Sequence, residues 1–123
     1  MALPFHMQQI QGRLVRDPEL KTTPSGKTVA VFDLAYLGRY KTDAQGSLVS
    51  FLKVEAWEKQ AEYVAKNLRK GMEVIVKGDL VQRRWQRADG KKASDFRLVM
   101  RGVLVCEPPQ NWQAVLGESP EAA

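Results

Sequence analysis

The feature that most constrains the fold of this chain is an alternation of apolar and polar residues that recurs along most of its length. Residues 7–16 (MQQIQGRLVR) show it plainly, since Ile10, Gly12 and Leu14 alternate with polar side chains. A period of two is typical of a strand that has one face in a core and the other in solvent. On this pattern, or on their β-branched and aromatic content, five segments are predicted to be strands: 7–16, 28–36, 48–57, 72–85 and 94–105.

Residues 58–70 are the one segment that changes to a helical period. Its apolar residues are spaced at i, i+3, i+4 and i+7, which places them on one face: Ala61, Val64, Ala65 and Leu68. Gly71 follows as a C-terminal cap, and Asp89-Gly90 predicts a tight turn between the last two strands. The predicted order is therefore three strands, one helix and two strands.

That order indicates an all-β fold with one helix, specifically the five-stranded Greek-key OB-fold barrel with the helix between strands 3 and 4. Such barrels bind single-stranded nucleic acid on an exposed face and its loops. The length of 123 residues leaves room for one such domain, which we assign to 7–106. Residues 1–6 and 107–123 are expected to be flexible. The second of these segments has adjacent prolines, no basic residue and weak periodicity.

The charge of the chain is concentrated in its middle. The net charge is +5, and between Lys66 and Arg101 eleven basic residues stand against four acidic ones. A bias of this kind attracts polyanions. It is equally typical of the solvated surface of a soluble protein, and charge alone leaves both interpretations open.

Several classes of protein are disfavoured by what the sequence lacks. No stretch approaches the roughly 18 to 20 apolar residues that span a bilayer, and the first residues do not resemble a secretion signal. The single Cys106 allows no internal disulfide and no cysteine-based zinc site, so the expected location is the cytoplasm. One histidine, His6, makes the usual catalytic arrangements improbable. Asp33, Glu55 and Glu58 lack metal-ligand spacing, and no phosphate-binding loop is present. We expect no catalytic residue, no metal and no cofactor.

In the third predicted strand, the face on which the aromatic residues lie is informative. Alternation within 48–57 directs its compact apolar residues to the barrel interior. The other face is left to Phe51, Lys53, Glu55 and Trp57. Two large aromatic side chains are thus predicted on an exterior that also carries a cation.

A second aromatic residue with basic neighbours stands in QRRWQR, where Trp85 lies among Arg83, Arg84 and Arg87. Exposed rings stack on unpaired bases, at roughly 1 to 3 kcal/mol per base, and arginine or lysine neutralises phosphates. The alternatives also stand. The aromatic side chains would pack in the core, in the hairpin or between subunits, and the basic hairpin 77–92 would only be solvated.

Short motifs in a fixed order run through residues 7–106: GRL at 12–14 with DPE at 17–19, VAVFDLA at 29–35, WEKQAEYVAKNLRKG at 57–71, VIVKGDL at 74–80, RRW at 83–85 and DGK at 89–91. In order and spacing the sequence resembles the bacterial single-stranded DNA-binding protein family. The resemblance implies a protein that binds single-stranded DNA without sequence preference during replication, recombination and repair. It also implies a homotetramer around which the DNA wraps, with a dimer as the second choice.

The resemblance also assigns residues. The family's stacking aromatics fall on Tyr40, Phe51, Trp57 and Trp85. Its phosphate-binding positions fall on Lys59, Lys70 and Arg84, with Lys53 and Arg83 as neighbours.

The chain departs from the family pattern in three places. Tyr40 and Phe51 stand where tryptophan is usual, and Leu52 stands where a histidine linked to tetramer stability is frequent. The acidic tip that recruits replication and repair enzymes is missing, so those partners are not carried over. Trp112 and Leu116 in the tail offer a docking segment instead, although a disordered remnant is the simpler interpretation.

Three other functions fit the same fold. One is a dimeric replication-restart factor like primosomal replication protein N, which would chiefly recruit other proteins. Another is an interaction module that binds no nucleic acid. An OB-fold nuclease is the most distant.

Overall fold

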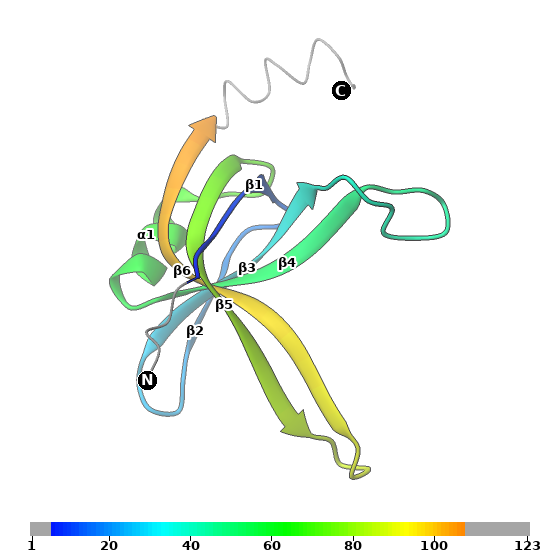
Figure 1. The fold of residues 1–123 in the computed structure, drawn as a ribbon. Helices are drawn as coiled ribbons and strands as arrows, with labels where there is room; N and C mark the ends of the chain where they lie inside the picture. The colour runs from blue at the N-terminus through cyan, green and yellow to red at the C-terminus, as the bar shows by residue number, and fades with distance from the viewer. Residues whose placement is uncertain (1–5, 108–123) are drawn as a thin grey trace.

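The computed structural model describes residues 6–107, which form six strands and one helix. Their order is β1 (Gln8–Leu14), β2 (Glu19–Thr22), β3 (Thr28–Leu37), β4 (Val49–Trp57), α1 (Lys59–Asn67), β5 (Glu73–Gln86) and β6 (Lys92–Glu107). The strands make one sheet in the order β1-β5-β6-β4-β3-β2, and β1 also pairs with β3, which closes the sheet (Figure 1). Only β4 and β6 pair in parallel; the other pairs are antiparallel. The predicted all-β barrel with one helix is confirmed.

The structure contains one short strand in addition to the five that were predicted. A short strand, β2, lies between the first two predicted strands and pairs with β3 from Glu19↔Val31 to Thr22↔Thr28. All four of its side chains are exposed, so it carries no alternation of burial for a sequence pattern to reveal. The helix consequently follows the fourth strand of the chain rather than the third.

The core fills the barrel and continues under the helix. Its fully buried side chains come from alternate positions along the strands and from the face of α1 that is turned toward them. The largest are Phe32, Leu34, Leu68, Leu98, Val54, Val64, Val74 and Val76. The predicted apolar face of the helix therefore caps the barrel through Ala61 and Val64, together with Leu68, the residue that follows α1. Ala65 is only partly buried.

Two glycines allow strands to approach closely. A Cβ atom added at Gly78 would lie 2.1 Å from the backbone oxygen of Val99, and one added at Gly12 would lie 2.4 Å from that of Ala35. No side chain fits at such distances without movement of the neighbouring backbone. Glycine is therefore required where β1 and β5 pass their neighbours in this small barrel.

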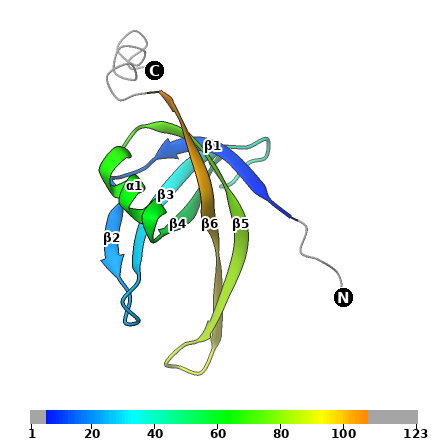
Figure 2. The same ribbon diagram turned by 90° about the vertical axis from the view of Figure 1, so that its left-hand side faces the viewer.

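The β5–β6 hairpin extends well beyond the core. β5 has 14 residues and β6 has 16, and every residue from 81 to 92 is exposed. Figure 2 shows the pair projecting from the barrel as a two-stranded arm. Its turn lies at the predicted Asp89-Gly90, where Asp89 Oδ1 accepts a hydrogen bond from the N–H of Lys91 at 3.0 Å. β6 is longer than predicted, because it runs from Lys92 to Glu107 instead of from Ser94 to Val105.

The expected flexible segments 1–6 and 107–123 fall, except for His6 and Glu107, outside the described residues. The same holds for Trp112 and Leu116, so these expectations remain predictions. No helix of the described part is long and apolar enough to cross a membrane.

Candidate nucleic-acid interface

The outer face of β4 carries the two aromatic residues that alternation placed there. Val54 and Ala56 are fully buried on the core side, whereas Phe51 is 67% exposed on the opposite side. Trp57, at the end of the strand, is half-buried and does not belong to the core cluster. The outer face of β4 therefore offers one open ring and one partly covered ring.

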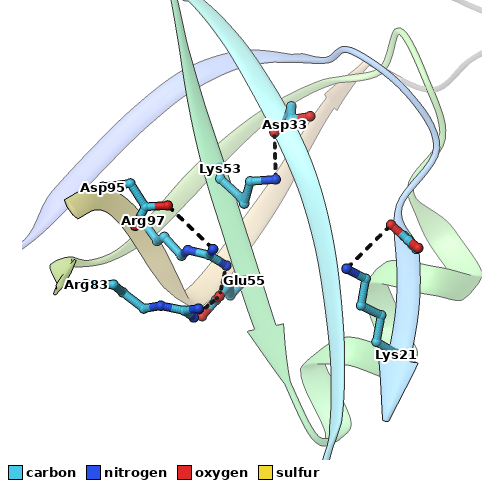
Figure 3. Close-up of polar contacts among 8 residues, drawn as sticks. Lys21, Asp33, Lys53, Glu55, Arg83, Asp95 and Arg97 are labelled. Atoms are coloured by element: carbon cyan, nitrogen blue, oxygen red, sulfur yellow. Dashed lines mark hydrogen bonds and ion pairs between the residues drawn. The ribbon is translucent and has the colours of Figure 1, made fainter. Parts of the chain in front are cut away.

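Lys53 lies between these two rings on the same face and is paired with an acid. Its Nζ lies 3.8 Å from Asp33 Oδ1 on β3 (Figure 3). Arg16 Nη2 lies 3.2 Å from the other oxygen of the same carboxylate. Since these groups are only partly covered, the pairs are weak and exchangeable. A phosphate that bound Lys53 would compete with Asp33.

Glu55 is the one buried charged residue among those described, at 5% exposure. Its Oε2 accepts hydrogen bonds from Arg83 Nη1 at 3.1 Å and from Arg97 Nη1 at 2.5 Å, and Arg97 Nη2 lies 3.5 Å from Asp95 Oδ2. These side chains converge from β4, β5 and β6 (Figure 3). Alternation correctly places Glu55 on the outer face of β4, but the guanidinium groups of Arg83 and Arg97 cover it there.

Arg83 and Arg84, which the resemblance groups together, lie on opposite faces of the hairpin. β5 pairs regularly with β6 in this region, with Arg83 opposite Asp95 and Arg84 opposite Ser94. Successive residues of a strand point to opposite sides. Trp85 therefore shares its face with Arg83, and it is 48% exposed, so neither predicted indole is buried inside the barrel.

The remaining predicted contact residues lie on other elements. Tyr40 is in the β3–β4 loop and is 82% exposed. Lys59 is the exposed first residue of α1, and Lys70 is exposed in the turn between α1 and β5. The backbone N–H of Lys70 donates to Asp17 Oδ1 at 2.8 Å, which fixes this turn against the segment after β1. In Figure 1 the β3–β4 loop and the β5–β6 hairpin extend from the barrel in different directions.

An open hollow of ≈ 490 Å³ joins Phe51 to the base of the β3–β4 loop. Its lining is Tyr36, Thr42, Asp43, Ser47, Val49, Ser50 and Phe51. The loop is held in place there, because Thr42 Oγ1 donates to the backbone oxygen of Val49 at 2.8 Å and Asp43 Oδ1 accepts from the N–H of Ser47 at 3.0 Å. Phe51 therefore borders a preformed depression rather than a flat surface.

Sequence reasoning missed Arg97 and Phe96. Phe96 is 53% exposed on the hairpin, and Arg97 covers Glu55. Both residues alternate within the predicted strand 94–105, so the period-two rule was sufficient to assign them to opposite faces. Within residues 6–107, no three histidine, cysteine or acidic side chains gather as a metal site.

Comparison with known proteins adds two kinds of finding. A model of the Single-strand binding protein family matches residues 5–105. Among curated proteins, a Single-stranded DNA-binding protein of Corynebacterium glutamicum is 41% identical over 93 residues, which are 72% of this chain and 41% of that protein. Single-stranded DNA-binding protein 1 of Staphylococcus aureus is 41% identical over 98 residues, covering 79% of this chain and 62% of the relative. This chain thus spans less than two thirds of the length of these relatives.

The fold has a counterpart among solved structures. A chain described as a Plasmodium falciparum SSB complex with ssDNA matches with a TM-score of 0.74 and 19% identity, over 87% of this chain and 99% of the other. This similarity supports the OB-fold assignment.

Proposed function

The chain belongs to the single-strand binding protein family, and on that basis we propose that it binds single-stranded DNA without regard to sequence. The observation that carries the proposal is the placement of aromatic side chains outside the core of an OB-fold, beside cations. Phe51 and Trp57 on β4 and Trp85 on the hairpin are all at least partly open. Unpaired bases offer flat faces to such rings, whereas duplex DNA keeps its bases stacked on each other.

In the proposed complex, bases and backbone are bound by separate groups. The stacking side chains are Tyr40, Phe51, Trp57 and Trp85, and the phosphate-binding side chains are Lys53, Lys59, Lys70, Arg83 and Arg84. None of these contacts reads the edge of a base, so the affinity would depend little on sequence. It would fall steeply with salt, because each neutralised phosphate releases counterions.

The biological role we propose is to coat and protect single-stranded DNA during replication, recombination and repair, in the cytoplasm. The proposal includes no catalytic step and no cofactor. The curated relatives are named for DNA binding, which supports a binding protein over an enzyme.

We further propose that the chain assembles with itself, as a homotetramer before a dimer. One supporting feature is β1, which pairs with β5 from Gln8 to Arg13 but with β3 only at Arg13 and Leu14, so within residues 6–107 most of its other edge is open. Another is Leu104, which is 62% exposed beside a hollow of ≈ 320 Å³ on β1, β5 and β6. Open strand edges and exposed apolar side chains are typical sites of subunit contact.

The test is light-scattering mass together with tryptophan fluorescence, with and without a long thymidine oligomer, at low and high salt. We expect four copies per complex, quenching by the oligomer and loss of binding at high salt. A duplex of equal length is the control and should leave the fluorescence unchanged. Unquenched fluorescence with the single strand would reject the proposal.

The same measurements separate the other functions. Two copies with a short bound strand would indicate a restart factor like primosomal replication protein N. Equal and weak retention of single strands, duplex and heparin would indicate an interaction module.

A further inference from the structure

The side of the β5–β6 hairpin opposite Trp85 carries an aromatic residue and two cations of its own. We call it the rear face, and it consists of Gln82, Arg84, Gln86, Lys92, Ser94 and Phe96. Gln82 pairs with Phe96 and Arg84 with Ser94, which makes Arg84 and Phe96 diagonal neighbours, a separation that long and aromatic side chains bridge. Phe96 is 53% exposed, slightly more than Trp85 at 48%. The hairpin thus presents an open ring on each side.

The two faces differ in how their cations are neutralised. On the side of Trp85, Arg83 and Arg97 are both bound to Glu55, and Arg97 also lies beside Asp95. The rear face contains no acidic residue. Within residues 6–107, neither Arg84 nor Lys92 has a carboxylate within ion-pair distance. A phosphate meets two uncompensated cations there, whereas it must displace a carboxylate to reach Arg83.

The hairpin is also hollowed. An open depression of ≈ 430 Å³ lies on the hairpin, and it is lined by Arg84, Trp85, Gln86, Lys92, Ala93 and Ser94. Four of these six belong to the rear face. Phe96 is not among the lining residues, but it lies diagonally across from Arg84, which is one of them. The hairpin therefore combines an open ring, unpaired cations and a depression, the parts that an unpaired polynucleotide needs.

We propose that the rear face is a second contact surface for single-stranded DNA, with Phe96 stacking on a base and Arg84 and Lys92 binding flanking phosphates. This proposal rests on the proposed function and deepens it. It divides the roles of the neighbouring arginines, because Arg84 binds a phosphate without displacing an acid, whereas Arg83 binds one only in competition with Glu55. A bound strand then contacts both sides of the hairpin.

The first test replaces Phe96 with alanine and measures affinity for a thymidine oligomer of about 16 nucleotides, the upper end of the site size of a single OB-fold. We expect the Kd to rise about 5- to 150-fold, which corresponds to the loss of one stacked base. The matched control is Leu20→Ala, because Leu20 on β2 is 52% exposed and far along the chain from the hairpin. Trp85→Ala serves as the reference for the proposed function.

The outcomes are distinguishable. If Phe96→Ala binds like the Leu20→Ala control while Trp85→Ala loses affinity, the proposed function stands and the rear face is rejected. If the unaltered protein fails to bind the oligomer, both proposals fall. If Phe96→Ala changes the mass of the DNA-free protein in light scattering, the ring is a subunit contact and the rear face is rejected.

The second test compares Arg84→Gln with Arg83→Gln in the slope of log affinity against log salt. We expect Arg84→Gln to reduce the slope by about one ionic contact, and Arg83→Gln to reduce it less. The reverse order would overturn the division of roles, even if both variants fold and bind.

Discussion

The buried carboxylate of Glu55 gives a sharp test of how the hairpin is held to the barrel. The perturbation is Glu55→Leu, which removes the acceptor shared by Arg83 and Arg97. Side-chain exposure is 7% for Glu55, 18% for Arg97 and 50% for Arg83. The pair with Arg97 is therefore largely removed from water, whereas the pair with Arg83 is not.

The magnitude follows from this difference. Removing one partner of a buried pair costs about 3 to 5 kcal/mol, because the other charge stays buried without compensation. Asp95 lies 3.5 Å from Arg97 and keeps part of that compensation, so we expect the lower end, about 3 kcal/mol. Arg83→Met should cost less than about 1 kcal/mol, as is typical of exposed pairs.

The assay is urea denaturation at a fixed protomer concentration, since self-assembly would couple concentration to stability. We expect the midpoint to fall with the m value unchanged. Replacing Arg97 with methionine in the Glu55→Leu background should restore most of the loss, because a buried ion pair exchanged for apolar residues is often neutral. The reasoning would be refuted if Glu55→Leu cost the same free energy in the presence and in the absence of Arg97.

Three further predictions test the site and the core. Trp57→Ala should weaken oligomer binding by about 1 to 3 kcal/mol at an unchanged melting temperature; a titration showing unchanged affinity would count against its stacking role. Gly78→Ala places a Cβ 2.1 Å from the backbone oxygen of Val99, so it should destabilise the fold by about 1 to 3 kcal/mol or more in thermal unfolding, and an unaltered midpoint would contradict the close approach. Leu34→Ala, at a fully buried site, should lower the free energy of unfolding by about 2 to 5 kcal/mol while leaving the affinity for the oligomer unchanged below the unfolding midpoint. A loss of affinity without a loss of stability would contradict this prediction.

Most of the fold is predictable from the sequence because burial and alternation coincide in its long strands. β3 is the clearest example, since Phe32 and Leu34 alternate into the core with partly covered neighbours. β2 is not predictable in this way. Its four residues are stabilised by backbone pairing with β3 and bury no side chain. The hydrophobic pattern of the sequence therefore does not reveal this strand.

The orientation of the candidate site's side chains was predictable to the same depth. Alternation identifies the outward direction of Phe51, which depends only on neighbours in the same strand. The burial of Glu55 depends on Arg97, which lies 42 residues away in the sequence. A local sequence pattern does not extend over so many residues, so it does not predict this contact. The separation of Arg83 from Arg84 follows from alternation, but grouping residues by motif conceals it.

The long hairpin has a consequence for how such a protein can vary. Its interior-facing side chains end near Leu98, and the residues from 81 to 92 contribute nothing to the core. Removing or adding cross-strand pairs at the tip would therefore change the length of the hairpin while leaving the barrel and its core intact. The length of the arm can therefore vary independently of the requirement that the barrel fold.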